Sequence, residues 1–102
     1  MSEITKDGDH VTIKPGRDVV ASIADEFKAE LNDLVGSSKG GLTIDLSGVE
    51  MVDSVGIGVI IATHNSLNKE SRKLTVINIS KDIFNLFNTM RLNRHFTIEA
   101  AE

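Results

Sequence analysis

Residues 42–61, with the sequence LTIDLSGVEMVDSVGIGVII, decide the fold of this chain. Their first five residues, Leu42–Leu46, alternate apolar and polar side chains as in a β-strand with one buried face. Ser47-Gly48 is a turn signal. Asp53-Ser54 then stands directly before an apolar run, where side chains that cap helices are preferred. The segment therefore predicts a strand, a loop and a helix from Asp53 to about Lys69.

The N-terminal part of the chain predicts a hairpin and a helix. Asp7-Gly8 readily adopts the positive φ angles of a tight turn, and short β-like runs flank it at Ile4–Lys6 and His10–Ile13. Pro15-Gly16 breaks the second run. From Asp18 the apolar residues recur at helical spacing, and Gly36 is the expected C-cap.

The C-terminal part adds two strands and a third helix. Leu74–Ile79 is an apolar strand, and Ser80 caps a helix whose inner face carries Ile83, Leu86, Phe87 and Met90. Phe96–Ile98 forms a last short strand. Helices between successive strands imply parallel pairing. We therefore expect a single α/β domain over residues 1–102, with a mixed β-sheet of four to five strands packed against three to four helices.

The composition excludes several classes of protein. Eleven Lys and Arg against fifteen Asp and Glu give a net charge of -4, which argues against binding to nucleic acid. The chain has no cysteine, so disulfides and thiolate metal sites are excluded. The longest apolar run, Val59–Ala62, is far too short for membrane insertion, and the polar N-terminus lacks a signal peptide. We expect a cytoplasmic protein.

Candidate chemistry concentrates at Asp53–Gly58. By pattern alone, Asp53-Ser54 is an ordinary N-cap. Gly56-x-Gly58 lacks the further residues of a dinucleotide or phosphate-binding loop. The first turn of a helix nevertheless favours negative charge, because its N–H groups are free and the helix dipole is positive there.

The remaining polar residues predict structural or solvated roles. His64 shares a helical face with Ile57 and Ile60 and is interpreted as a packing residue. His10 and His95 have no partners at metal-ligand spacing, so no metal site is expected. Lys69–Lys73 is interpreted as a solvated helix end, and Arg91 and Arg94 as solvated surface.

The segments Leu42–Val49 and Met51–Ile61 resemble the core of the STAS domain, typified by bacterial anti-sigma factor antagonists. The resemblance continues more loosely through Leu74–Ile79 and Ile83–Leu92. It implies a regulatory protein without enzymatic activity or cofactor. In that family the serine at the position of Ser54 is phosphorylated by an anti-sigma factor that is a serine kinase, and the unphosphorylated form binds the kinase.

The resemblance implies partner switching, with a kinase and a phosphatase as partners and a monomer or weak dimer as the state of the chain. A STAS regulatory subunit of a transporter, a phosphatase or a signalling enzyme is the alternative.

A helical wheel places Val55, Val59, Ala62 and Ser66 opposite the apolar face, so we expect exposed valines at positions 55 and 59. Gly56 and Gly58 would let a kinase approach the backbone. The expected motif and docking residues are Asp53, Val55, Gly56, Gly58, Val59, Ala62 and Ser66.

Overall fold

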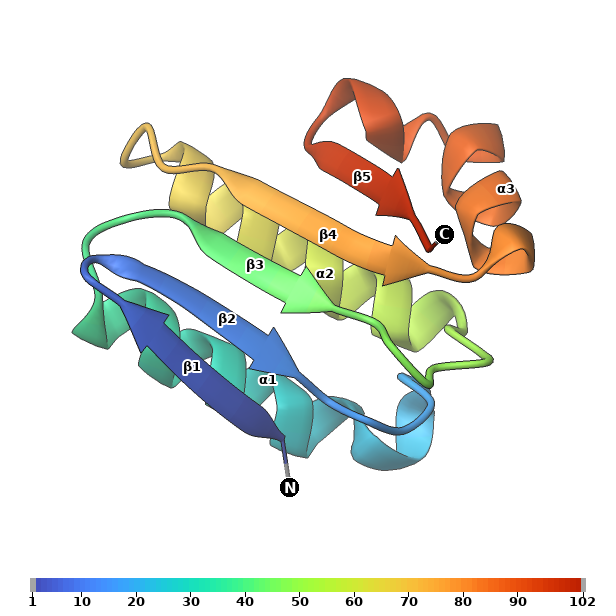
Figure 1. The fold of residues 1–102 in the computed structure, drawn as a ribbon, viewed down its shortest axis with the longest axis horizontal. Coiled ribbons are helices and arrows are strands. Elements are labelled where there is room, and N and C mark those ends of the chain that lie inside the picture. Colours follow the sequence, from blue (N-terminus) through green and yellow to red (C-terminus); the bar gives the residue numbers. More distant parts are fainter. Residues whose placement is uncertain (1, 102) are drawn as a thin grey trace.

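The computed structural model describes residues 2–101, which form a five-stranded mixed sheet and three α-helices (Figure 1). The predicted α/β fold class is confirmed. The elements in chain order are β1 (Glu3–Asp7), β2 (His10–Lys14), α1 (Ala21–Ser37), β3 (Leu42–Asp45), α2 (Ser54–Asn68), β4 (Leu74–Ile79), α3 (Lys81–Thr89), the 3-10 turn η1 (Leu92–Arg94) and β5 (Thr97–Ala100).

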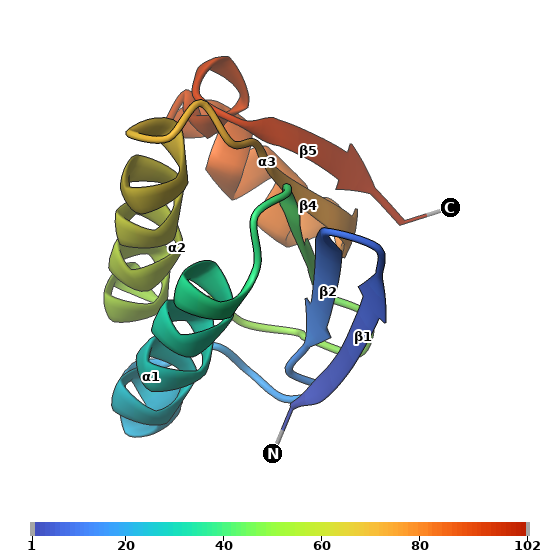
Figure 2. The same ribbon diagram turned by 90° about the vertical axis from the view of Figure 1, so that its left-hand side faces the viewer.

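The sheet order follows the chain, β1-β2-β3-β4-β5. The first pair is antiparallel, and Gly8 has the positive φ of 64° that its tight turn requires. The later pairs are parallel. Each crossover moves in the same direction along the sheet, and crossovers are right-handed. The helices therefore collect on one face, where Figure 2 shows α1 and α2 side by side.

The core lies between that face and the helices. Alternate residues of the three central strands point into it and are buried: Val11, Ile13, Leu42, Ile44, Leu74 and Val76. Phe27 and Leu31 of α1, Ile60 and Leu67 of α2 and Phe87 of α3 are also fully buried. Each such side chain contributes roughly 1.5–3 kcal/mol relative to an exposed one.

The opposite face of the sheet carries a row of threonines, one from each strand. Thr5 pairs with Thr12, Thr12 with Thr43, Thr43 with Thr75 and Thr75 with Thr97. β-Branched hydroxyl side chains suit a pleated surface that faces water on one side. The ring nitrogen Nε2 of His10 lies 2.6 Å from the hydroxyl of Thr43. This row explains how the face stays polar without a covering helix.

Helix α1 differs from the prediction at both ends. It begins at Ala21 instead of Asp18, because the Asp18 carboxylate accepts hydrogen bonds from the N–H groups of Glu50 (2.9 Å) and Met51 (3.1 Å). It also continues through Gly36 to Ser37, so Gly36 is not its C-cap. The N–H and hydroxyl of Ser38 instead satisfy the carbonyl of Leu34.

Two further predictions, both for residues that follow α2 in the chain, were wrong. Strand β5 begins at Thr97, because Phe96 is buried at the end of the turn that η1 forms. Arg72, predicted to be solvated, has a side chain only 8% exposed. Its guanidinium donates to the carbonyls of Gly40 (2.8 Å) and Val35 (3.0 Å) and to the hydroxyl of Ser38 (3.0 Å). Arg72 thus ties the end of α1 to the start of β4.

Candidate functional site

Ser54 lies where two helices begin next to one another. Its neighbour Asp53 has an extended backbone and is the N-cap of α2, and its Oδ1 accepts a hydrogen bond from the N–H of Gly56 at 2.8 Å. The other oxygen, Oδ2, accepts from the N–H of Ala21, the first residue of α1, at 2.9 Å. One carboxylate therefore caps both helices.

The two loops that lead into these helices are joined by backbone hydrogen bonds. Val19 forms a parallel bridge with Val52, and its N–H donates to the carbonyl of Met51 at 3.0 Å. The N–H of Asp53 donates in turn to the carbonyl of Val19 at 3.2 Å. These bonds fix Asp53 and Ser54 relative to the start of α1.

Hydrogen bonding keeps Asp53 ionised. The N–H of Gly56, followed by that of Ala21, holds the pKa of Asp53 below its ordinary value. The positive ends of two helix dipoles meet at this carboxylate and act in the same direction.

Asp45 fixes the far end of the loop before Ser54. Its Oδ1 accepts hydrogen bonds from the N–H and hydroxyl of Ser47 (2.9 and 2.7 Å) and from the amide of Asn78 (3.0 Å). Burial alone would raise the pKa of Asp45, but these bonds outweigh it and lower the pKa. This role of Asp45 was not predicted from the sequence, although an Asp two residues before a Ser is a known turn signal.

The Ser54 side chain is open to solvent. The residue is exposed, and its hydroxyl makes no hydrogen bond within residues 2–101. Two apolar residues near it in the chain are also exposed, Val55 by 48% and Met51 by 57%. The hydroxyl is therefore accessible to an enzyme that approaches this end of the molecule.

The predicted docking face of α2 is only partly exposed. Val55, Gly58 and Ala62 are exposed and Ser66 is half-buried. Val59 is 8% exposed, so the expectation that it lies on the surface is wrong. The reason is that α2 is buried on two sides, by the sheet and by α1, which packs along it.

The two glycines of the motif differ in their surroundings. A Cβ added at Gly56 would lie 2.0 Å from the carbonyl oxygen of Val19, whereas one added at Gly58 would meet nothing within 4 Å. Gly56 is buried and permits the close contact between α2 and the loop before α1. The interpretation that Gly56 admits a kinase is therefore corrected, and only Gly58 faces solvent.

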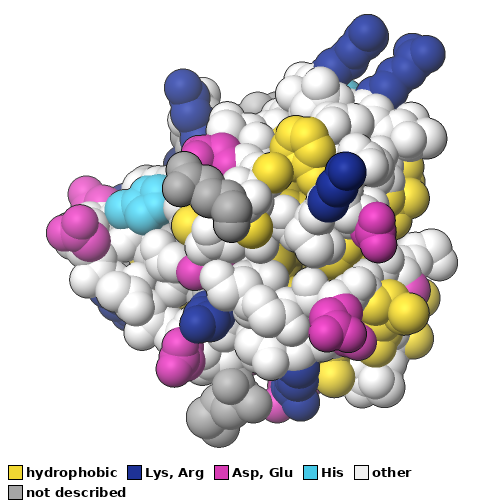
Figure 3. Space-filling view, turned by 45° about the vertical axis from the view of Figure 1, so that its right-hand side comes forward, with side chains coloured by type: hydrophobic (Ala, Val, Ile, Leu, Met, Phe, Trp, Pro, Cys, Tyr) yellow, Lys and Arg dark blue, Asp and Glu magenta, His cyan; other side chains and the backbone are white. Residues whose placement is uncertain are grey.

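A second exposed apolar area lies on α3. Leu86 and Met90, one helical turn apart, are 39% and 44% exposed. Figure 3 views the side of the molecule that carries α3 and β5, and shows hydrophobic surface between scattered charges. A cavity of about 280 Å³ lies beside Met90, between α2 and the segment of residues 90–96 that follows α3. Its lining is Ile61, His64, Asn65, Met90, Leu92, His95 and Phe96.

His64 has the packing role that the sequence predicts. It is half-buried, and its ring centroid lies 5.5 Å from that of Phe96 and 6.1 Å from that of His95. Burial, followed by the charge of His95, lowers the pKa of His64. Residues 2–101 contain no group of three or more His, Asp or Glu side chains placed to hold a metal ion.

The STAS domain family model matches residues 1–102. This chain belongs to the STAS domain family. It is 31% identical over 99 residues to the anti-sigma-B factor antagonist of Listeria monocytogenes, an alignment that covers 95% of this chain and 85% of that protein. The resemblance drawn from residues 42–61 is thereby confirmed.

Solved structures show the same fold. A Thermotoga maritima protein superposes with a TM-score of 0.90 at 20% identity, over 96% of this chain and 85% of that chain. The Bacillus cell fate determinant SpoIIAA in its phosphorylated form superposes with a TM-score of 0.76 at 13% identity, over 96% of this chain and 90% of that chain. Within residues 2–101 of this STAS domain, no helix has both the length and the apolar character needed to cross a bilayer.

Proposed function

We propose that this STAS domain is an anti-sigma factor antagonist that works by partner switching. In its unphosphorylated form it binds an anti-sigma factor that is also a serine kinase. That kinase phosphorylates Ser54 and is released, and a phosphatase restores the binding form. The observation that carries this proposal is the exposed, unbonded hydroxyl of Ser54 on a rigidly capped helix start.

The surroundings of Ser54 support a protein partner. Met51 and Val55 place exposed apolar surface near the hydroxyl, and Gly58 and Ala62 continue the exposed side of α2. Exposed apolar residues grouped in this way often mark an interface. We define the docking surface as Met51, Val55, Gly58 and Ala62. Val59 is excluded because it is buried, and Ser66 belongs to its half-buried margin.

Phosphorylation would oppose binding at this surface. A phosphate carries about two negative charges, and a partner that covers it must remove its water. The two helix starts favour an added anion, so the domain should stay folded. We therefore expect Ser54 phosphorylation to weaken partner binding by at least about tenfold, or 1.4 kcal/mol.

The experiment combines binding with mapping of the modified residue. Kinase-type anti-sigma factors from the same genome are titrated with wild type, Ser54→Ala and Ser54→Asp, with Ser37→Asp as the control that adds a charge at the far end of α1. We expect Ser54→Ala and Ser37→Asp to bind like wild type and Ser54→Asp to lose affinity, with similar melting temperatures. Phosphate incorporated into Ser54→Ala, or equal affinity of all four proteins, would refute the proposal.

A further inference from the structure

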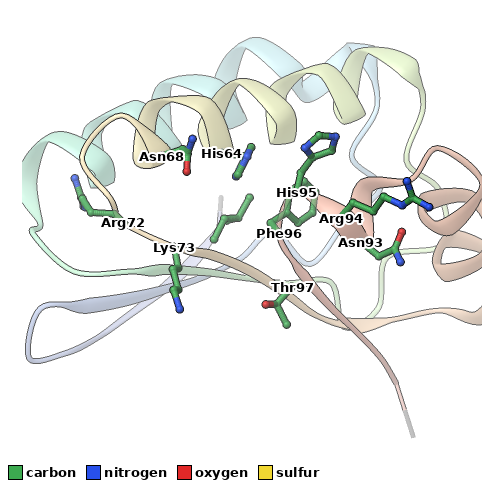
Figure 4. Close-up of a pocket in the computed structure, with 10 residues that line it drawn as sticks. His64, Asn68, Arg72, Lys73, Asn93, Arg94, His95, Phe96 and Thr97 are labelled. Atoms are coloured by element: carbon green, nitrogen blue, oxygen red, sulfur yellow. The ribbon is translucent and has the colours of Figure 1, made fainter.

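A polar cavity of about 350 Å³ opens at the end of α2 that is remote from Ser54 (Figure 4). The 15 residues of α2 separate it from Ser54 by about 20 Å. Residues of α2, of the start of β4 and of the η1 to β5 segment line it. The lining residues are His64, Asn68, Arg72, Lys73, Leu74, Asn93, Arg94, His95, Phe96 and Thr97.

The charged residues that line this cavity are all cationic, although one of them, Arg72, is paired with Glu70 beside it. Among residues 2–101, three cationic side chains and two imidazoles line it, and no Asp or Glu does. Five of the eleven Lys and Arg lie in 69–73 and 91–94, where Glu70 is the one acid, although the chain as a whole carries a charge of -4. Cations gathered at one place in an acidic protein attract an anion.

Apart from Arg72, the side-chain hydrogen-bond donors of the lining have no acceptor within residues 2–101. Within residues 2–101, the side chains of Lys73, Arg94 and Asn68 form neither hydrogen bonds nor ion pairs, and the same holds for both imidazoles. Arg72 is different, since its guanidinium is bound to the carbonyls of Gly40 and Val35, to Ser38 and to Glu70. These donors therefore have no intramolecular partner, and Asn68, Lys73, Arg94 and His95 are exposed at the rim of the cavity, where their side chains are free to bind a ligand.

Hydrogen bonds reduce the negative charge that the end of α2 presents to an anion there. Helix C-termini carry partial negative charge on free carbonyls. Here the carbonyl of Leu67 accepts from the N–H groups of Glu70 and Arg72, and that of Asn65 accepts from Lys69. These bonds occupy the carbonyls that would otherwise repel a negative ligand.

We propose that this cavity binds a small phosphate-bearing molecule. Figure 4 shows His64 and Asn68 extending down from α2, whereas the exposed side chains of Lys73 and Arg94 point away from them and must rotate to reach a ligand bound there. A guanidinium and an ammonium bind phosphate oxygens with strong charge-assisted hydrogen bonds. The half-buried His64 and exposed His95 imidazoles and the Asn68 amide supply further donors, and Phe96 and Leu74 supply an apolar wall. The volume is at the low end for ligand pockets, which suits a small phosphate monoester.

The three histidines make the test site-specific. We would titrate the 15N-labelled protein with inorganic phosphate and with glycerol 3-phosphate, using glycerol and KCl at matched ionic strength as controls. The His64 and His95 ring signals should shift and saturate with both phosphates and with neither control. His10 should not respond. It lines a neighbouring cavity of about 450 Å³ that also contains Lys39, Arg72 and Lys73.

Variants complete the experiment. Arg94→Gln should weaken binding by roughly tenfold to a hundredfold, the loss of one charge-assisted contact. Arg91 lies in the same segment as Arg94 but does not line the cavity, so Arg91→Gln should bind phosphate like wild type. Lys39→Gln should also bind like wild type. The proposal is overturned if no signal saturates with either phosphate, if Arg91→Gln and Arg94→Gln are equally affected, or if His10 responds and Lys39→Gln abolishes binding. Ser54 takes no part, so the result is independent of the proposed switching function.

Discussion

Replacement of Gly56 by alanine should destabilise the domain, and the same change at Gly58 should not. The new Cβ at position 56 would lie 2.0 Å from the Val19 carbonyl oxygen and must move by about 1 Å to reach even the shortest contact that real Cβ atoms make. The obstacle is backbone, so rotation of a side chain cannot remove it. The same carbonyl accepts the hydrogen bond from the Asp53 N–H, which the shift would strain.

The magnitude follows from three opposing effects. Overpacking costs about 1–3 kcal/mol, and loss of the Asp53 to Val19 hydrogen bond costs about 1 kcal/mol. Alanine regains about 1 kcal/mol through its higher helix propensity. We therefore expect Gly56→Ala to lower the free energy of unfolding by about 2 kcal/mol, or roughly 10 °C in melting temperature for a domain of this size. Gly58→Ala should raise the free energy of unfolding by about 0.5–1 kcal/mol.

Urea denaturation followed by circular dichroism measures both variants. Val19→Ala combined with Gly56→Ala should not restore stability, because the contact is with the carbonyl oxygen and not with the side chain. Wild-type stability of Gly56→Ala would refute the close approach of α2 to the Val19 loop. A loss of equal size in Gly58→Ala would show that the motif needs glycine at 58 for another reason.

Three further predictions concern buried and capping residues. Arg72→Lys should lose about 2–3 kcal/mol of stability in a thermal or urea melt, because an ammonium cannot bond Gly40, Val35 and Ser38 together; a wild-type melt would contradict this. Val59→Asp should unfold the domain while Ala62→Asp stays folded, and circular dichroism separates the two. The lowered pKa of Asp53 means that its contribution is present near neutral pH and lost as pH falls through the folded pKa. Melts of wild type and Asp53→Asn should therefore differ most near neutrality and converge well below about pH 4; a constant difference would count against the ionised cap.

Local patterns were enough to predict the elements of this fold. The alternation in residues 42–46, the Asp7-Gly8 turn and the Ser80 cap each act within a few residues, so the chain shows them without tertiary information. Helix α2 was also predicted within one residue at each end, because Asp53 caps it locally.

The wrong predictions concern residues whose contacts are with residues far away in the sequence. Asp18 has the side chain of a helix cap but bonds Glu50 and Met51, 32 and 33 residues away. Arg72 lies in a charged run yet reaches across to Val35 and Gly40. The helical wheel of α2 assumed burial on one side, whereas α1 buries Val59 from another. None of these contacts has a signal in the local sequence, which is why they required the structure.

The geometry around Ser54 also bears on how a switch could work. Its hydroxyl has no intramolecular hydrogen bond within the described residues, so a phosphate added there breaks no existing contact. The ionised Asp53 nearby repels that phosphate, but two helix N-termini meet at the same point and attract it. These effects oppose one another, and the bonds between the Val19 and Val52 loops resist rearrangement. Under the proposed function, phosphorylation would therefore act by changing the surface that a partner meets, without refolding the domain that presents it.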